Sequence, residues 1–392
     1  MKTTEYQVTM QSIIHDTQGY SRAGREYILG LDRAGVDIRI EPLNFGTPSA
    51  RLDMDQVKRL KELIQKPRDM NKKQILIYHA QPYGVNAIHE REKNGYDKVI
   101  INTVWETTKV PDNWFPFINY ADAVVVPSTQ NVQALRDSGV SVPIFKVPHG
   151  SDPIKFSPEN EKFKLPDLDG KFKFLSVFQW QHRKGPDKLL KAYWNEFTEK
   201  DNVALIVKSY WGNNVLKSDQ RMILNTLYRY KEHLGKNETN SAPVYYSGSM
   251  FSDNDLKGLY TLSDIYVLPS RGEGVGLPYI EAMSSGIPCI ATGWGGQTDF
   301  INEENGYLIN YELQSTTYAN NEAIAQNFFH LFTEDMLWAE ADVKHLQKLM
   351  RHAYEHQEEV KAKGKKARED IKKMTWDKVG YIFKESIEKV LP

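Results

Sequence analysis

The sequence predicts an α/β protein of two domains, each with a parallel sheet that helices cover on both faces. Three observations support this prediction. The chain has 392 residues, more than one ordinary hydrophobic core accommodates. Short apolar runs alternate with helical patterns along most of its length, as in βαβ units. A polar segment with three prolines, residues 153–171, separates two stretches of this kind and is expected to be a linker.

The first stretch begins with an expected strand at residues 8–14, followed by a loop. A helix is expected from residue 22 to residue 34, because Gly35 supplies a stop signal. Four more strands are expected at short apolar runs, namely residues 36–40, 75–78, 98–103 and 123–126.

The second stretch repeats the scheme, with an expected strand at residues 172–178 and an expected helix at residues 186–196. Further strands are expected at residues 203–207, 244–246, 265–268 and 289–291. Residues 121–128 and 263–270 also share one pattern: an acidic residue, a short strand, then Pro-Ser at a turn where a helix is expected. This echo supports two similar halves, although any two βα units can look alike.

The C-terminal part of the chain is different. Residues 338–373 are highly charged and expected to be helical, with a basic cluster at 361–368 that we interpret as a solvated face. A final helix is expected at residues 376–390. Its apolar stripe must pack on one of the domains, and it consists of Val379, Ile382, Phe383, Ile387 and Val390.

Composition narrows the class of protein. The net charge of −1 gives no electrostatic case for nucleic-acid binding. The only cysteine, Cys289, lies in an apolar run, which favours a reducing compartment, and no stretch has the length of a signal core or a membrane span. We therefore expect a cytoplasmic protein. Contact with a membrane surface stays open, because residues 57–64 form a basic amphipathic stretch, for which a plain surface helix is the favoured interpretation.

Two glutamates separated by seven residues mark the candidate site. Glu273 lies in a glycine-rich turn, and Glu281 follows Pro278 near an expected helix start. Backbone N–H groups between them can face an anion. Two carboxylates beside such a cradle suit a phosphorylated, polyhydroxylated ligand such as a nucleotide sugar. The alternative is an ordinary strand–turn–helix connection.

Two cations follow the first expected strand of the second stretch. Arg183 and Lys184 lie where open α/β sheets bind ligands. Breaking a sugar–phosphate bond places negative charge on the departing diphosphate, which such groups can stabilise. The alternative for Lys184 is a solvent-exposed loop lysine.

Together these motifs resemble the retaining glycosyltransferases of the GT-B architecture, specifically glycosyltransferase family 4, the glycosyl transferases group 1. The resemblance covers nearly the whole chain and is carried by residues 260–309, 182–185, 148–152 and 19–24. It implies two Rossmann-like domains that face each other across a cleft. Residues 1–152 would form the acceptor-side domain and residues 172–375 the donor-binding domain, with the last helix, within 376–392, crossing back to the first domain.

The resemblance also implies roles for single residues. Glu281 would bind the ribose hydroxyls of the donor, and Glu273 would contact the donor sugar and assist catalysis electrostatically. A side chain at Gly276 could obstruct the approach of the phosphates. The residues expected to bind the donor are Arg183, Lys184, Gly274, Val275, Gly276, Leu277, Glu281 and Gly19.

One departure from the family pattern concerns the diphosphate. Many members have an arginine six residues before the phosphate-binding lysine, and this chain has Phe178 there. Arg183 or a divalent ion could compensate for the missing cation. Metal dependence therefore stays open, while no cofactor and no metal-ligating residue is expected.

The acceptor side is less clearly encoded. Where family members often place a histidine, this chain has residues 103–107. We interpret Glu106 as a second candidate catalytic residue, and Trp105 could stack on a sugar. The alternatives are a helix cap for Glu106 and packing between domains for Trp105. His79 could line the cleft or be a structural histidine.

The activity that the resemblance implies is transfer of a hexose from a nucleotide diphosphate sugar to a glycan, a lipid-linked sugar or a protein. The anomeric configuration would be retained without an enzyme nucleophile, because the diphosphate itself helps to deprotonate the acceptor. The alternatives are a sugar-nucleotide epimerase or a phosphorylase on the same fold, and a non-catalytic nucleotide-sugar-binding protein. The base, the sugar and the acceptor are not readable from the sequence.

Overall fold

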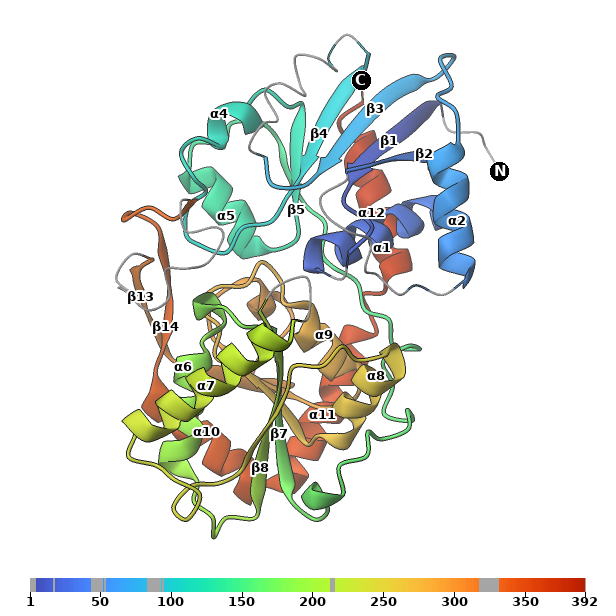
Figure 1. The fold of residues 1–392 in the computed structure, drawn as a ribbon. Helices are drawn as coiled ribbons and strands as arrows, with labels where there is room; N and C mark the ends of the chain where they lie inside the picture. The colour runs from blue at the N-terminus through green and yellow to red at the C-terminus, as the bar shows by residue number, and fades with distance from the viewer. Residues whose placement is uncertain are drawn as a thin grey trace. The chain divides into compact units, whose positions relative to one another are not determined.

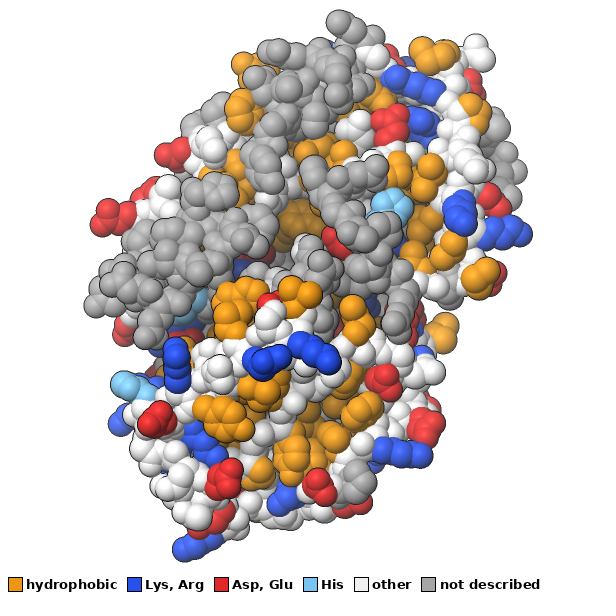
Figure 2. Space-filling model, in the orientation of Figure 1, with side chains coloured by type: hydrophobic (Ala, Val, Ile, Leu, Met, Phe, Trp, Pro, Cys, Tyr) orange, Lys and Arg blue, Asp and Glu red, His pale blue; other side chains and the backbone are white. Residues whose placement is uncertain are grey.

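The computed structural model describes residues 5–16, 18–43, 52, 54–82, 93, 95–211, 216–316 and 331–391. The chain divides into two compact units, each an α/β structure, as predicted (Figure 1). Unit 1 comprises Met1–Gly150 together with Met374–Pro392, and unit 2 comprises Ser151–Lys373. On the face drawn in Figure 2, acidic and basic side chains are interspersed, in keeping with a net charge of −1.

Unit 1 contains a parallel sheet in the order β2-β1-β3-β4-β5-β6. The strand order reverses between β1 and β3, so the loops after these two strands flank the point where such sheets bind ligands. The strands are β1 Tyr6–Ser12, β2 Asp37–Pro42, β3 Lys73–His79, β4 Lys98–Asn102, β5 Ala123–Val126 and β6 Ile144–Lys146. The helices are α1 Gly19–Arg33, α2 Met54–Gln65, α4 Phe115–Ile118, α5 Thr129–Asp137 and α12 Trp376–Glu388.

Unit 2 contains a second parallel sheet in the order β12-β11-β10-β7-β8-β9. Here the order reverses between β7 and β10. The strands are β7 Phe172–Gln179, β8 Val203–Tyr210, β9 Val244–Ser247, β10 Ile265–Leu268, β11 Cys289–Thr292 and β12 Gly306–Ile309. The helices are α6 Pro186–Glu196, α7 Lys217–His233, α8 Asp253–Leu262, α9 Leu277–Ser284, α10 Val343–Glu355 and α11 Gln357–Ile371.

The charged C-terminal stretch corrects one expectation. Residues 337–341 are not helical but form strand β14, which pairs antiparallel with β13, Tyr311–Ser315. The carboxylate of Asp342 accepts hydrogen bonds from the backbone N–H groups of Lys344 and His345 and caps α10. The helix therefore begins at Val343, because the residues before it belong to a strand whose partner lies far away in sequence.

The segment predicted as a linker, residues 153–171, packs on unit 2. Phe156 and Leu168 are buried in the hydrophobic core of that unit, and the ring of Phe163 stacks on Phe251 with centroids 5.2 Å apart. These apolar residues are too widely spaced to form a periodic pattern, so the sequence alone predicted a linker.

The last helix packs on unit 1, as predicted. Val379, Phe383 and Ile387 of α12 are fully buried, and burying each side chain of this size contributes about 1.5–3 kcal/mol. Helices α1 and α12 cross at Gly30 and Gly380, where an added Cβ at Gly380 would collide with the carbonyl oxygen of Gly30. Backbone contact at the crossing therefore requires glycine.

Candidate functional site

The strand order of unit 2 brings the predicted cations and the first glutamate together. The basic turn, His182–Lys184 with Gly185, follows β7, and the donor loop, residues 270–276, follows β10. Because β7 and β10 are parallel neighbours, their carboxyl ends lie at the same edge of the sheet. Lys184 Nζ donates to Glu273 Oε1 at 2.6 Å and Oε2 at 2.8 Å, and Arg183 Nη1 lies 3.5 Å from Oε2.

Glu273 is ionised in this arrangement. Its side chain is buried, and burial alone would raise the pKa of the carboxyl. The positive charges of Lys184 and Arg183 outweigh burial and hold the pKa of Glu273 below its usual value. Two cations thus face one carboxylate at this edge of the sheet.

A buried arginine fixes the donor loop against the basic turn. Arg271 is 2% exposed and donates two hydrogen bonds to Asp187, at 2.8 and 2.7 Å, and others to Glu340 and to the carbonyl oxygen of His182. Its backbone N–H donates to the carbonyl oxygen of Arg183 at 2.6 Å. No local sequence signal predicted this network, because its members come from three distant segments: the basic turn with α6, the donor loop and β14.

The charges of this network are balanced. Burial would raise the pKa of Asp187, but the hydrogen bonds and positive charge of Arg271 lower it to about 2. Burial would also raise the pKa of Glu340, but Arg271 and Lys188 hold it below its usual value. Burial, with the nearby charge of Arg271, lowers the pKa of His182 to about 4, so this imidazole is neutral.

Further hydrogen bonds define the path of the donor loop. Ser270 Oγ donates to the carbonyl oxygens of Arg183 and Gly272, each 3.1 Å away, and Gly296 N–H donates to the carbonyl oxygen of Glu273 at 2.8 Å. Gly276 has φ +84° and directly precedes α9, where an added Cβ would lie 2.5 Å from the ring of Tyr279. A side chain at Gly276 would thus be strained in the chain itself.

The other predicted donor-loop residues lie at the start of α9. Gly274 and Val275 precede Gly276, and Leu277 is the first residue of the helix. The side chain of Val275 is buried in the core of unit 2, so its backbone is the part that remains for a ligand.

Glu281 occupies the second turn of α9. It is 4% exposed, and its Oε2 accepts a hydrogen bond from the Tyr260 hydroxyl at 2.6 Å. Tyr260 lies on α8, so two helices of unit 2 fix the direction of this carboxylate. The contact between Tyr260 and Glu281 was not predicted from the sequence.

Phe178, which stands where family members have an arginine, is part of the packing of unit 2. It lies on β7, is 4% exposed, and stacks on Trp180 with ring centroids 5.8 Å apart. This ring therefore supplies no positive charge to the site.

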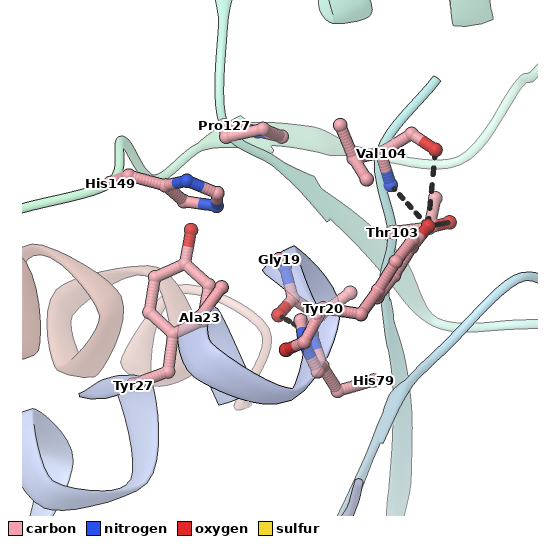
Figure 3. A pocket seen from close by; sticks show the side chains of 10 residues that line it. Gly19, Tyr20, Ala23, Tyr27, His79, Thr103, Val104, Pro127 and His149 are labelled. Atoms are coloured by element: carbon pink, nitrogen blue, oxygen red, sulfur yellow. Dashed lines mark hydrogen bonds between the residues drawn. The ribbon is translucent and has the colours of Figure 1, made fainter. Parts of the chain in front are cut away.

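Unit 1 has a small pocket where its strand order reverses (Figure 3). Gly19 begins α1, and a Cβ there would meet open space, whereas Tyr20 donates to the carbonyl oxygen of Val104 at 3.1 Å. The pocket is lined by Gly19, Tyr20, Ala23, Tyr27, His79, Asn102, Thr103, Val104, Pro127 and His149.

Two histidines line this pocket, and both are neutral. His79 is 3% exposed, with Nδ1 2.6 Å from Asn102 Oδ1 and Nε2 3.0 Å from the carbonyl oxygen of Tyr20. Burial lowers the pKa of His79 despite these two acceptors. Burial also lowers the pKa of His149 to about 3, and the nearby positive charge of Arg22 adds to this. His149 lies in a motif that the sequence analysis noted without assigning the histidine a role.

The remaining predicted residues of unit 1 lie in the loop after β4. Trp105 is 3% exposed, packs edge-on against Trp114, and donates from Nε1 to Thr107 Oγ1 at 2.7 Å. Its ring is thus largely buried by packing within unit 1. Glu106 is partly exposed and lies outside any helix, and its charge adds to burial in raising the pKa of Tyr20.

The parts of the chain that the structure describes contain neither a membrane-spanning helix nor a metal-binding cluster. No helix in those parts of the chain combines the length and the apolar character needed to cross a bilayer. In the same residues, no three His, Cys, Asp or Glu side chains are grouped so that they could hold a metal ion.

The family model of glycosyl transferases group 1 matches residues 157–325. This stretch includes the basic turn, the donor loop and Glu281, so the chain carries a glycosyl transferases group 1 domain.

Two curated relatives illustrate the similarity. The chain is 28% identical over 204 residues to the lipopolysaccharide core biosynthesis mannosyltransferase LpsB of Rhizobium meliloti, a match that covers 50% of this chain and 53% of LpsB. It is 27% identical over 185 residues to alpha-monoglucosyldiacylglycerol synthase of Streptococcus pneumoniae, covering 45% and 38%. The chain thus spans about half or less of the length of these relatives.

A solved structure matches along the whole chain. HepE of Anabaena, in complex with UDP and glucose, is similar with a TM-score of 0.69 at 12% identity, covering 98% of this chain and 100% of HepE. At this identity the likeness concerns the fold, which is GT-B, as predicted.

Proposed function

We propose that this protein is a retaining glycosyltransferase that transfers a hexose from a nucleotide diphosphate sugar to a glycan, a lipid-linked sugar or a protein. The observation that carries the proposal is the contact of Lys184 and Arg183 with the buried carboxylate of Glu273, at the point where the strand order of unit 2 reverses. HepE contains UDP and glucose, which makes UDP-glucose the first donor to test.

The cations of the basic turn would serve the departing diphosphate. When the sugar–phosphate bond breaks, negative charge develops on the phosphate oxygen, and Lys184, Arg183 and the N–H groups at the start of α9 stabilise it. These groups are held in place before the reaction by Arg271 and Ser270. Such prior fixation makes the stabilisation effective, because little reorganisation is needed.

The two glutamates would act on the hydroxyl-bearing parts of the donor. Glu281, fixed by Tyr260, accepts hydrogen bonds from the ribose. Glu273 accepts hydrogen bonds from the sugar ring and places negative charge near the anomeric carbon as that carbon becomes cationic. The acceptor hydroxyl gives its proton to the departing diphosphate on the same face, which retains the anomeric configuration.

Unit 1 would supply the acceptor side. Residues 1–152 with 376–392 form the acceptor domain in this proposal, and residues 172–375 form the donor domain. Gly19 leaves open space beside α1, and Glu106 carries a charge beside Tyr20. His79 would position Tyr20 through its carbonyl oxygen rather than contact a substrate.

A nucleotide screen tests the donor assignment. UDP, GDP, ADP and their sugars are added to the purified protein, and the unfolding temperature is measured. A bound donor at 100 times its Kd stabilises the folded state by about 2.7 kcal/mol. The proposal predicts stabilisation by one nucleoside diphosphate, and it is wrong if none raises the unfolding temperature.

Product analysis then separates the three functions. Transfer requires an acceptor and releases the nucleoside diphosphate. Epimerase activity would convert one sugar nucleotide into another without an acceptor. A binding protein would be stabilised by the donor without turnover. This alternative is motivated by Phe178, which stands where many family members have an arginine.

A further inference from the structure

One buried cation in unit 2 has no role in the chemistry described so far. Lys208 lies near the carboxyl end of β8 and is 7% exposed. Its Nζ lies 5.1 Å from the ring centroid of Phe251 and 5.6 Å from that of Tyr210. Within the described parts of the chain, no carboxylate forms an ion pair with it.

The surroundings of Lys208 differ from those of Arg271, which is also buried in unit 2. Arg271 is matched by two carboxylates, Asp187 and Glu340. Among the residues that the structure describes, Lys208 faces the rings of Phe251 and Tyr210, which offset part of the unfavourable desolvation of an ammonium group. Burial lowers the pKa of Lys208 to about 8, so most of the population carries the charge at neutral pH. A buried charge that lacks a counter-ion is a favourable partner for an anion.

The position of Lys208 in the sheet relates it to the donor site. Strand β8 neighbours β7, the strand that leads to the basic turn, and Lys208 is paired in register with Val177. Paired residues of neighbouring strands share a face of the sheet, so Lys208 lies on the face opposite to Phe178. Phe251, which its ammonium contacts, directly precedes the N-cap of α8, the helix whose Tyr260 holds Glu281.

The distances across the sheet are compatible with one ligand. Strands are spaced about 4.8 Å apart, so β8 lies about one spacing from β7 and about two from β10. Lys184 follows β7, and Glu273 follows β10. The strands that carry or precede the three charged groups are therefore neighbours, and their carboxyl ends lie at the same edge of the sheet.

We propose that Lys208 is a donor-binding residue whose ammonium group binds a phosphate oxygen of the nucleotide and so replaces the cation that Phe178 does not supply. This inference rests on the proposed function of the same site. An ammonium group has three donors and no acceptor, which suits it to phosphate oxygens.

Binding measurements with UDP, UMP and uridine test the inference. Isothermal titration compares the parent protein with Lys208→Met, which keeps the length and apolar character of the side chain and removes the charge. We expect the affinity for UDP to fall about tenfold or more, as for loss of a charge-assisted hydrogen bond. The affinity for uridine, which has no phosphate, should change less than twofold.

Two further variants serve as controls. Lys173→Met removes a lysine from β7 at the opposite, amino-terminal edge of the same sheet, where it pairs with Asp264, and it should leave UDP affinity unchanged. Lys208→Arg keeps the charge and should retain more UDP affinity than Lys208→Met. If Lys208→Met does not fold, Lys208→Gln replaces it in the same comparison.

The outcomes separate this inference from the proposed function. If the parent binds UDP and Lys208→Met binds it equally, Lys208 is not a phosphate ligand, while the proposed function stands. An equal loss of uridine and UDP affinity also overturns the inference, because the effect then lies on the base or on the fold. If the parent binds no nucleotide in the screen, the proposed function itself fails.

Discussion

Residues 121–128 of unit 1 and 263–270 of unit 2 share a sequence pattern, and the comparison of their structures separates what builds the fold from what builds the site. Asp122 accepts a hydrogen bond from the N–H of Val99 at 2.8 Å, and Asp264 accepts one from the N–H of Lys173 at 2.7 Å. Each carboxylate thus fixes the start of the neighbouring strand. The acidic residue and the short strand have the same role in both units.

The two segments differ after the Pro-Ser dipeptide. Ser128 caps α5, which begins at the next residue. Ser270 instead donates to carbonyl oxygens of the donor loop and the basic turn, and α9 begins only at Leu277. The residues inserted before α9 include Arg271 and Glu273. The common βα pattern builds the scaffold, and a loop inserted into one copy carries the candidate chemistry.

The two sheet edges also differ in charge. In unit 2, the ionised groups Lys184, Arg183 and Glu273 lie together. In unit 1, the pocket is lined by His79 and His149, both neutral because burial lowers their pKa values. We therefore expect the anionic part of a donor to bind to unit 2, and variants at the two edges to respond differently to charge and pH.

The largest effect is expected from removing the charge of the basic turn. Lys184→Met takes away the cation that contacts Glu273 and would stabilise the departing diphosphate. We expect kcat/KM for donor turnover to fall about 10²–10³-fold, as for loss of one preorganised electrostatic contact. Release of the nucleoside diphosphate measures this. Lys191→Met, at an exposed position of α6, is the control, and similar activity of both variants would contradict the assignment of Lys184.

The second largest effect concerns the stability of unit 2. Arg271→Met leaves the carboxylates of Asp187 and Glu340 without their partner, which should reduce the free energy of unfolding by about 3 kcal/mol at pH 7. Because the folded-state pKa of Asp187 is depressed to about 2, the stabilisation it brings is present above about pH 4 and is lost as pH falls towards 2. Urea unfolding at pH 7 and pH 3 should therefore show a smaller difference between parent and variant at pH 3.

A surface ion pair provides the matched control for Arg271. Arg33 pairs with Asp377, and both side chains are largely exposed. Arg33→Met should change the free energy of unfolding by about 1 kcal/mol or less. An Arg271→Met variant as mild as this control would mean that the buried network does not hold the donor loop.

Local signals predicted the scaffold well. The bounds of β5, β10 and α6 agree with the sequence analysis, because each is an apolar run or stripe with a clear boundary residue. The pairing of β14 with β13 could not be predicted, since it depends on a partner strand distant in sequence. That is why the beginning of the expected C-terminal helix was wrong.

Contacts between distant segments of the candidate site could not be predicted from the sequence. Glu273 and Lys184 were recognised separately, each from its own motif. Arg271 stands inside a recognised motif, but its partners Asp187 and Glu340 lie in other segments, and nothing local in the sequence pairs them. In the sequence, Lys208 directly follows the strand expected at residues 203–207. Its burial beside aromatic rings, with no ion pair to a carboxylate in the described parts of the chain, is visible only in the fold.

A smaller effect is expected from the neutral histidine of unit 1. His149 has a folded-state pKa of about 3, whereas an unfolded histidine titrates near 6.5. Because the unfolded state takes up the proton first, stability falls as pH drops from about 6.5 towards 3. Between pH 7 and pH 5 this residue should account for a loss of about 1–2 kcal/mol. His149→Phe should lose that much less than the parent in urea unfolding, and an equal loss in both proteins would show that His149 is not held neutral.

The smallest effect is expected at the partner of Glu281. Tyr260→Phe removes the hydroxyl that fixes this carboxylate and leaves the carboxylate in place. Loss of one hydrogen bond corresponds to about 1 kcal/mol, so UDP affinity should fall about fivefold while turnover at saturating donor stays nearly constant. Tyr266→Phe is the matched control, because its buried hydroxyl donates to the carbonyl oxygen of Val177 instead. If the two variants bind UDP equally well in a titration, the role of Glu281 is contradicted, because the hydroxyl of Tyr260 donates to that carboxylate and the hydroxyl of Tyr266 does not. A fivefold difference between them would link α8 to nucleotide binding through this single hydroxyl.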